Sequence, residues 1–269
     1  MTAKLTTRMV AKPWGKDQLP APFVAPVGEH IGEVWFEPPA KFDALLVKYI
    51  FTSEALSVQV HPSDAQTEAA GLGRQGKEEC WLVVDAQPGA ALGIGFREPL
   101  GPEAMRAAAL DGSIEHLLEW HPVTAGDFFY IPANTVHAIG AGISLVEIQQ
   151  NSDITYRLYD YGRPRELHLD EGMAVAQGIP HPPALRTRLA PVGGATLVEG
   201  PLFRLDRLDG EVPGQVRRRY GSEPVLVIPL DAAVHVAGEI IAAGECALAP
   251  SLDAVMLADG AKVLVTQPV

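Results

Sequence analysis

Proline and glycine recur at short intervals along the chain and divide it into brief runs rich in valine, isoleucine, leucine and aromatic residues. The 269 residues include 26 glycines and 23 prolines. Because these two residues interrupt regular structure, such spacing is typical of many short strands joined by turns. Strands are expected at residues 45–51, 57–61, 79–84, 127–131, 143–149, 224–230, 235–236 and 262–266. The sequence therefore predicts a mainly β protein, built as a sandwich or jelly roll.

One segment departs from this pattern. Residues 102–120, PEAMRAAALDGSIEHLLEW, are rich in helix formers and carry apolar residues at helical spacing. The Asp-Gly pair at residues 111–112 interrupts the segment, because glycine weakens a helix interior. Two short helices are therefore expected within residues 102–120.

Prolines accumulate and periodicity is lost in IPHPPALRTRLAP, residues 179–191. This composition predicts a boundary between a first domain at residues 1–185 and a second, smaller β domain at residues 186–269. The stretch GEIIAAGECALAP in the second domain is similar in outline to TAGDFFYIPAN in the first. A duplicated β-roll unit would explain the similarity of these two stretches.

Charge and cysteine content exclude several classes of function. The chain has 33 acidic and 21 basic residues, a net charge of −12, which disfavours binding to nucleic acid. Cys80 and Cys246 lie far apart and in no CxxC pattern, so they are expected to be buried thiols. The N-terminus lacks an apolar signal segment and no run is apolar enough to cross a bilayer. We expect a cytoplasmic monomer or homodimer with no membrane partner.

The stretch LSVQVHP, residues 56–62, places polar side chains on one face of a strand. Gln59 and His61 are two residues apart and therefore point the same way. Glu79 in GKEECW and His137 in GDFFYIPANTVHAIG lie at or beside further expected strands. Two histidines, one glutamate and one glutamine suit a divalent cation, zinc first, with iron, manganese and cobalt as alternatives.

Several motifs of the sequence resemble those of a known family. The spacing of Gly126, Pro132 and His137 resembles the second metal motif of the cupin superfamily. The motifs LSVQVHP, GKEECW, GDFFYIPANTVHAI and EIQQNSDITYRLYDYGR are similar to those of the type I mannose-6-phosphate isomerases in their short bacterial form. The resemblance covers residues 12–163 and is only architectural beyond them. It implies a cupin-type jelly-roll domain followed by a smaller cupin-like β domain.

The resemblance implies a Zn²⁺-dependent isomerase that interconverts mannose 6-phosphate and fructose 6-phosphate. Moving a proton between C2 and C1 of an open-chain sugar through an enediol requires a base and a group that stabilises the developing negative charge. A metal held by Gln59, His61, Glu79 and His137 can supply that stabilisation.

The resemblance also points to the remaining catalytic and substrate-binding residues. Arg157 is expected to contact the substrate, and Glu147 and Asp153 are both candidates for the base, with turn formation as the structural alternative for Asp153. No glycine-rich phosphate loop is present, so Lys77, Arg157 and Ser57 are expected to hold the phosphate. Lys77 lies two residues before Glu79 and is expected to reach the same pocket as a further catalytic group.

Lys48 is a charge within an apolar strand, LLVKYI, and is expected to be paired or to face the pocket. Two other functions remain open at this stage. One is a sugar-phosphate-binding cupin without catalysis, and the other is a different metal-dependent cupin enzyme such as a dioxygenase.

Overall fold

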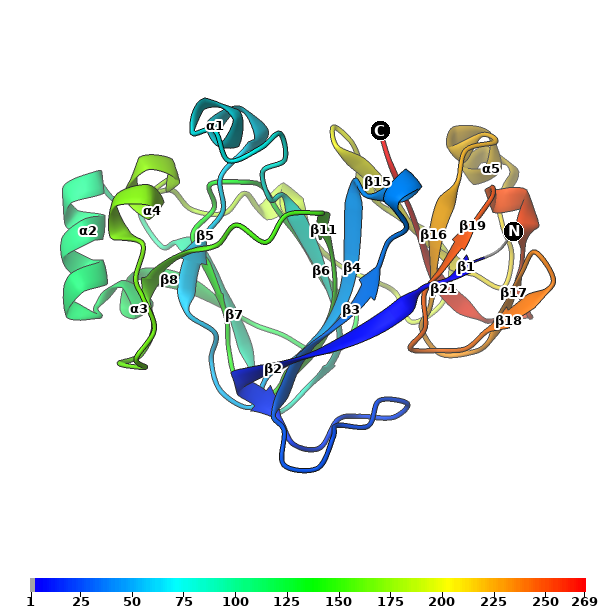
Figure 1. Ribbon diagram of the computed structural model, residues 1–269, viewed down its shortest axis with the longest axis horizontal. Coiled ribbons are helices and arrows are strands. Elements are labelled where there is room, and N and C mark those ends of the chain that lie inside the picture. The colour runs from blue at the N-terminus through cyan, green and yellow to red at the C-terminus, as the bar shows by residue number, and fades with distance from the viewer. Residues whose placement is uncertain (1–2) are drawn as a thin grey trace.

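The computed structural model describes residues 3–269, so residues 1 and 2, at the start of the first predicted domain, lie outside the described part. The chain forms stacked layers, with helices α2 (Pro102–Asp111), α3 (Ile114–Leu117) and α4 (Leu169–Val175) at one end and a second group of strands at the other (Figure 1). All paired strands are antiparallel. The first unit consists of two facing sheets, and the second unit packs against one of them.

The larger sheet of the first unit has seven strands, in the order β13-β9-β6-β11-β4-β3-β2. In that order they are β13 (Arg186–Arg188), β9 (Asp127–Ile131), β6 (Glu79–Ala86), β11 (Ile143–Gln150), β4 (Leu45–Phe51), β3 (Ile31–Glu37) and β2 (Thr6–Lys16). The 3-10 turn η1 (Ala40–Phe42) joins β3 to β4.

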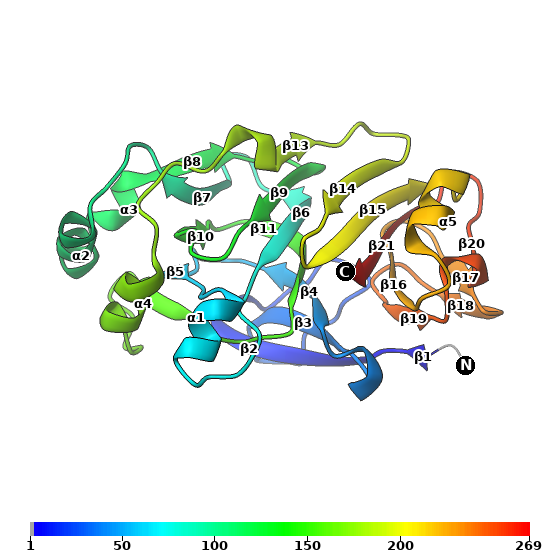
Figure 2. The same ribbon diagram turned by 90° about the horizontal axis from the view of Figure 1, so that it is seen from above.

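The smaller sheet has five strands, in the order β12-β5-β10-β7-β8. They are β12 (Tyr156–Tyr159), β5 (Val58–Val60), β10 (His137–Ile139), β7 (Ala91–Phe96) and β8 (Leu118–Pro122). The helices of this unit are α1 (Asp64–Ala69), α2 (Pro102–Asp111), α3 (Ile114–Leu117) and α4 (Leu169–Val175). Val58 and Val60 pack with residues of α2–α4, so the outer face of this sheet lies under the helices, as the view from above also indicates (Figure 2).

The seven-stranded sheet is covered on both faces, which explains why every residue of β4 and β11 is buried. Alternate residues such as Val47, Tyr49 and Leu82 pack on the second unit, whereas Ile50, Trp81 and Leu145 pack toward the five-stranded sheet. Strand alternation therefore gives each of these strands one face toward the second unit and one face toward the space between the two sheets of the first.

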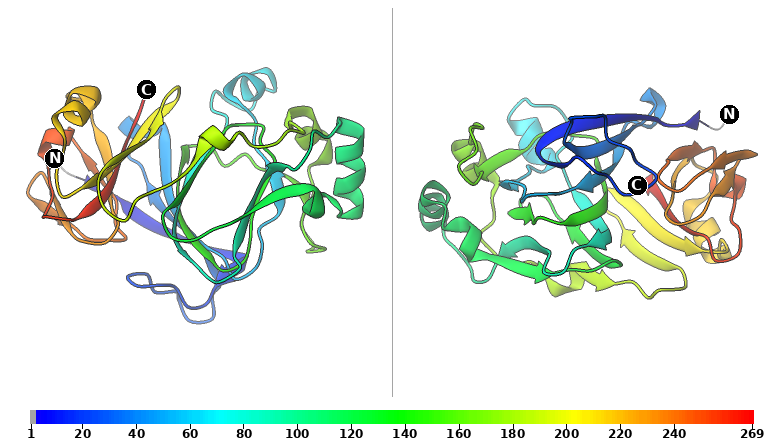
Figure 3. Two further views of the ribbon diagram at one scale, coloured as in Figure 1. Left: turned by 180° about the vertical axis from the view of Figure 1, so that it is seen from behind. Right: turned by 90° about the horizontal axis from the view of Figure 1, so that it is seen from below.

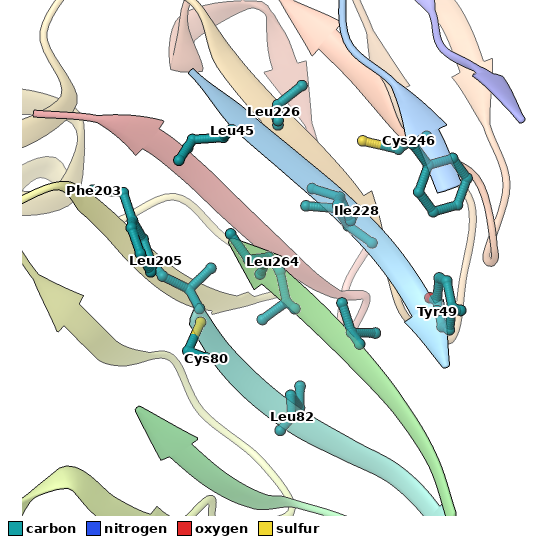
Figure 4. Packing of buried hydrophobic residues seen from close by; sticks show 14 of the residues in the cluster. Leu45, Tyr49, Cys80, Leu82, Phe203, Leu205, Leu226, Ile228, Cys246 and Leu264 are labelled. Carbon is teal, nitrogen blue, oxygen red and sulfur yellow. The ribbon is translucent and has the colours of Figure 1, made fainter. Parts of the chain in front are cut away.

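The second unit contains a six-stranded and a three-stranded sheet. The strands of the six-stranded sheet are, in order, β1 (Ala3–Lys4), β19 (Ala247–Ala249), β16 (Val225–Pro229), β21 (Lys262–Pro268), β15 (Phe203–Asp209) and β14 (Ala195–Glu199). Those of the three-stranded sheet are β18 (Glu239–Ile241), β17 (Val234–Val236) and β20 (Val255–Met256). The remaining elements are α5 (Gly214–Tyr220) and the 3-10 turns η2 (Pro183–Leu185) and η3 (Leu252–Ala254). Leu205, Leu226 and Leu264 of this unit face Leu45 and Leu82 of the first across one apolar cluster (Figure 4).

The prediction of a mainly β chain with two short helices within residues 102–120 is confirmed. Gly112 ends α2 with a positive φ of 82°, which glycine adopts without strain, and α3 follows directly. The division into domains at residues 185 and 186 stays a prediction. Strand pairing crosses that line, because β1 pairs with β19 and β13 pairs with β9. Figure 3 shows the blue N-terminal part of the chain reaching the orange strands of the second unit. Among residues 3–269, no helix is long and apolar enough to cross a membrane.

Candidate metal centre and cavity

Three donors come together where the two sheets of the first unit face each other. His61 follows β5 directly, His137 begins β10 and Glu79 begins β6. One ligand atom from each lies within 4.8 Å of the others, and all three residues are buried. The Glu79 Oε1 atom is 3.7 Å from His61 Nε2 and 3.4 Å from His137 Nε2. Donors that each bind one ion at about 2 Å lie roughly 3–4 Å apart, so these three can share a single metal ion.

Both histidines are held with the same ring nitrogen toward the centre. His61 Nδ1 lies 2.8 Å from the carbonyl oxygen of Ile154, and His137 Nδ1 lies 2.9 Å from that of Thr135. Because a carbonyl oxygen only accepts, each Nδ1 carries the proton and each Nε2 keeps its lone pair. Burial lowers the pKa of both rings, to about 3 for His137, so both are neutral at pH 7, as metal ligands must be.

A carboxylate and an amide complete the donor set. Glu79 Oε2 is paired with Lys77, but the other oxygen, Oε1, is buried and has no hydrogen-bond partner among residues 3–269, so this atom lacks the donor or cation that a buried carboxylate oxygen needs. Gln59 pairs with His137 across β5 and β10, and its amide Nε2 is 3.2 Å from His137 Nε2. A half-turn of that amide brings an oxygen to this point, since the two amide atoms are interchangeable in shape. The residues present therefore fit a divalent metal ion.

Lys77 lies beside these donors. Its ammonium forms an ion pair with Glu79 and is 3.1 Å from His61 Nε2. Gly76 allows this close approach, because a Cβ there would lie 2.4 Å from a neighbouring carbonyl oxygen. Burial lowers the pKa of Lys77, but the carboxylates of Glu147 and Glu79 outweigh burial and raise it overall. Lys77 is thus a buried cation at the centre of the site.

Glu147 is a buried carboxylate with three partners. Its Oε1 is 3.2 Å from Lys48 Nζ and 3.9 Å from Lys77 Nζ, and its Oε2 accepts a hydrogen bond from Trp81 Nε1 at 3.0 Å. Burial raises the pKa of this carboxyl, but Lys77 and Lys48 outweigh burial and bring it to about 2. A carboxylate with so low a pKa is a weak proton acceptor at neutral pH. Glu147 is therefore suited to holding the two lysines in place.

A cavity of about 420 Å³ opens next to the donors. Six of the predicted site residues line it: Ser57, Gln59, Lys77, Glu147, Asp153 and Arg157. His61, Glu79 and His137 lie beneath its wall, in contact with Gln59 or Lys77. A larger hollow of about 760 Å³ lies between the loops at residues 72–75 and 150–154 and the end of the chain, and it is not lined by any of the four metal-donor candidates. The smaller cavity is therefore the candidate active site.

The remaining predicted residues lie at the rim of the 420 Å³ cavity or in its wall. Asp153 is exposed, whereas Arg157 on β12 is half-buried and opposite Gln59. The Arg157 Nε donates to the carbonyl oxygen of Glu166 at 2.9 Å, and its two terminal nitrogens have no bond to any residue within 3–269. Ser57 is buried and its hydroxyl lies 3.2 Å from Gln59 Oε1.

Sequence reasoning did not identify several polar residues of the cavity wall. Arg8 and Lys12 come from β2, and Arg165 and His168 come from the segment after β12. Period-2 alternation in RMVAKPW would have placed Arg8 and Lys12 on one face of β2. No local pattern distinguishes Arg165 from the other arginine of YGRPRE, because only the folded segment decides which one faces the cavity.

The facing sheets and converging donors define a cupin-like β protein with a candidate metal centre. Comparisons with known proteins agree with this class. The chain is 44% identical over 137 residues to the mannose-6-phosphate isomerase of Streptococcus mutans, an alignment that covers 49% of this chain and 43% of the relative. The chain spans about half the length of the curated relatives it matches. No protein-family model matches the sequence.

Solved structures are similar over nearly the whole chain. The mannose 6-phosphate isomerase of Bacillus subtilis superposes with a TM-score of 0.77 at 22% identity and covers 98% of both chains. A zinc-bound mannose 6-phosphate isomerase superposes with a TM-score of 0.72 at 15% identity and covers 99% of both. The expected cupin-like fold and the expected resemblance to mannose-6-phosphate isomerases are therefore confirmed.

Proposed function

We propose that this chain is a metal-dependent aldose–ketose isomerase that interconverts mannose 6-phosphate and fructose 6-phosphate. The observation that carries the proposal is a set of neutral-histidine, glutamate and glutamine donors beside a cavity of fitting size. The similarity to mannose-6-phosphate isomerases supports the choice of substrate. Zn²⁺ is the proposed ion, with Gln59, His61, Glu79 and His137 as its ligands, because two imidazoles and a carboxylate suit it.

The charge of the cavity supports an anionic substrate. The whole chain has a net charge of −12. The cavity is lined by six cationic side chains, Arg8, Lys12, Lys48, Lys77, Arg157 and Arg165, and by three carboxylates, Glu33, Glu147 and Asp153. A positive pocket in an acidic protein concentrates anions at that pocket. A sugar phosphate satisfies this requirement, whereas an uncharged sugar does not use it.

The residues divide the chemistry between them. Bound Zn²⁺ would act as a Lewis acid toward the substrate oxygens. Asp153 is the proposed base, since it is exposed at the cavity and has no cation bound to it in the described part of the chain; it takes the C2 proton of the open-chain aldose and returns it to C1 of the enediol. Glu147 holds Lys48 and Lys77, and Lys77 donates to the developing enediolate oxygen. Arg157 and Ser57 contact the substrate.

An assay of fructose 6-phosphate formation from mannose 6-phosphate, coupled to a dehydrogenase, tests this proposal. Zn²⁺-loaded protein should turn over, protein treated with a chelator should not, and restored Zn²⁺ should recover activity. Binding without turnover in the loaded protein would favour a sugar-phosphate-binding cupin. Consumption of oxygen without isomerisation would favour a dioxygenase.

The identity of the base is tested by isotope and by substitution. In heavy water, the ketose should take up deuterium at C1, because a proton held by a carboxylate exchanges with solvent. Complete absence of deuterium would favour a hydride shift and remove Asp153 from the role of base. Asp153→Asn should lower kcat by about 10²–10⁴, whereas the exposed control Asp170→Asn, outside the cavity on α4, should not.

The predictions of a cytoplasmic location and of a monomer or homodimer belong to the same proposal. Sedimentation equilibrium measures the number of subunits. Fractionation of the source cells measures the location.

A further inference from the structure

Asp160, just after β12, is a buried carboxylate that holds two arginines at once. Arg165 binds it through Nε at 2.6 Å and Nη2 at 2.7 Å, and Arg163 binds it through Nε at 3.1 Å and Nη2 at 2.8 Å. Asp160 is 3% exposed. One buried carboxylate therefore pairs with two guanidinium groups, so it does not by itself balance both of them.

The two arginines differ in their other contacts. Arg163 also donates to the carbonyl oxygen of Ala55 at 2.7 Å, lies 3.7 Å from a Glu54 carboxylate oxygen and is not among the residues that line the cavity. Arg165 lines the cavity and, within residues 3–269, has no hydrogen-bond partner other than Asp160. Glu54 therefore supplies Arg163 with a second carboxylate, whereas Arg165 has only its share of Asp160 and faces the cavity.

Arg165 lies close enough to Arg157 to affect it. Both side chains line the same cavity. Burial and the like charge of Arg165 lower the pKa of Arg157, and the carboxylates of Asp160 and Glu166 offset this only in part. Keeping two guanidinium groups close together costs free energy unless an anion lies between them. Because a guanidinium fork matches the oxygens of a phosphate, such a pair is suited to a phosphate group.

The opposite wall of the cavity has no comparable excess of charge. There, Lys12 lies 3.1 Å from Glu33, Lys48 lies 3.2 Å from Glu147 and Arg8 lies 2.9 Å from Glu37. Each of these three cations thus has a carboxylate within 3.2 Å, although Glu147 is also 3.9 Å from Lys77. The wall formed by β2–β4 therefore attracts a dianion less strongly than the wall formed by Arg157 and Arg165.

We infer that Arg165 is a specificity residue that binds the substrate phosphate together with Arg157, and that Asp160 is the positioning residue that holds Arg165 there. The inference rests on the proposed function for the identity of the substrate. The ligand chemistry itself, a phosphate dianion, follows from the two guanidinium groups and the charge of the cavity.

Calorimetric titration of the metal-loaded protein with inorganic phosphate, mannose 6-phosphate and mannose tests the role of Arg165. Arg165→Gln should weaken binding of both phosphate ligands about 10- to 100-fold and leave mannose unaffected. Arg165→Lys keeps the charge but loses the forked guanidinium, so its affinity for both phosphate ligands should lie between those of the unaltered protein and of Arg165→Gln. The control Arg106→Gln removes an exposed arginine on α2 that pairs with Asp170, and should bind as the unaltered protein does.

Asp160→Asn tests the positioning role. Loss of the carboxylate should free Arg165, raise KM for mannose 6-phosphate about 3- to 10-fold and leave kcat nearly unchanged, because the reacting carbons are not touched. A general loss of structure would lower the amount of active protein and hence kcat, with KM unchanged. If Asp160→Asn does not fold, Arg165→Lys alone decides the matter.

The inference is overturned if Arg165→Gln binds inorganic phosphate and mannose 6-phosphate normally, or if Arg8→Gln loses as much affinity as Arg165→Gln does. Failure of the proposed function gives a different result. In that case the unaltered protein would bind phosphate through Arg165 but would not isomerise mannose 6-phosphate.

Discussion

The two β units of this chain differ in what fills the space between their sheets. In the first unit the inner faces of β5, β6 and β11 carry Gln59, Glu79 and Glu147, with Lys77 and His137 beside them. In the second unit the corresponding interior is an apolar cluster of buried valine, leucine, isoleucine and alanine side chains with one tyrosine, Tyr220. The second unit also buries a carboxylate, that of Asp206, which is paired with Arg219.

This difference shows how one kind of architecture serves two purposes. Burying a polar group costs free energy unless it is paired, so a polar interior persists only where every group has a partner or a ligand. At the candidate site of the first unit, ion pairs meet this condition for Lys48, Lys77 and Glu147, and a bound metal ion would meet it for Glu79 Oε1. The second unit has a filled apolar core and supports the first by packing on the outer face of its seven-stranded sheet.

Removal of a metal donor should have the largest effect of all. His137→Ala should abolish retention of Zn²⁺ and lower activity at least about 10³-fold, because loss of Lewis-acid stabilisation is worth several kcal/mol. Metal content by mass spectrometry and the coupled assay measure both. The control is His235→Ala, an exposed histidine on β17 of the second unit, which should change neither. An active, metal-free His137→Ala protein would show that the polar interior has another purpose.

Arg157→Ala should have the next largest effect. Its side chain is half-buried and its one side-chain hydrogen bond, to Glu166, is at the surface, so the melting temperature should change little. Loss of a charge-assisted contact in the transition state should lower kcat/KM about 10²–10³-fold. Arg217→Ala, which removes an exposed ion pair in the second unit, is the matched control. Normal kcat/KM in the Arg157 variant would take that residue out of the mechanism.

Alternation along single strands predicts much of the first unit. Gln59 and His61 could be placed on one face because their spacing is two residues, and Lys48 was recognisable as a charge within an apolar strand. The contact of Lys48 with Glu147 required the β4–β11 register, which pairs these two residues directly. Local pattern thus identifies which side chains need partners, and the sheet pairing decides which partner each one finds.

Contacts between distant segments could not be predicted. The pairing of β1 with β19 joins residues 3–4 to residues 247–248, and no local pattern encodes it. The role of Asp160 depends on the turn after β12, where Tyr161 adopts a positive φ of 55° and brings two arginines to one carboxylate. Such a turn depends on tertiary contacts that a single sequence does not display.

A cavity in the apolar core of the second unit should affect stability and not catalysis. Leu208 on β15 is 1% exposed and belongs to that core. Leu208→Ala should lower the free energy of unfolding by about 2–5 kcal/mol. Urea denaturation measures this loss, and kcat at 25 °C should stay within about twofold, since the substitution lies outside the active-site cavity. A large loss of kcat in the folded variant would mean that the two units are coupled during catalysis.

The smallest expected effect concerns the loss of stability at acid pH, to which the buried His181 of the first unit should contribute. His181 is buried, its Nε2 is 2.8 Å from the carbonyl oxygen of Tyr130, and burial lowers its pKa below the usual 6.5. The unfolded chain therefore binds a proton below pH 6.5 that the folded chain resists, so this contribution is present above pH 6.5 and is lost as the pH falls.

Replacement of His181 by glutamine removes that proton uptake. The free energy of unfolding should then fall less steeply between pH 6.5 and pH 5, by up to roughly 1 kcal/mol per pH unit. Urea titrations of the metal-free protein at several pH values measure the slope. His235→Gln, at an exposed position in the second unit, should leave the slope unchanged. Equal slopes for His181→Gln and the unaltered protein would mean that acid sensitivity comes from other groups. Among residues 3–269, His61, His121 and His137 are the other buried histidines with lowered pKa values.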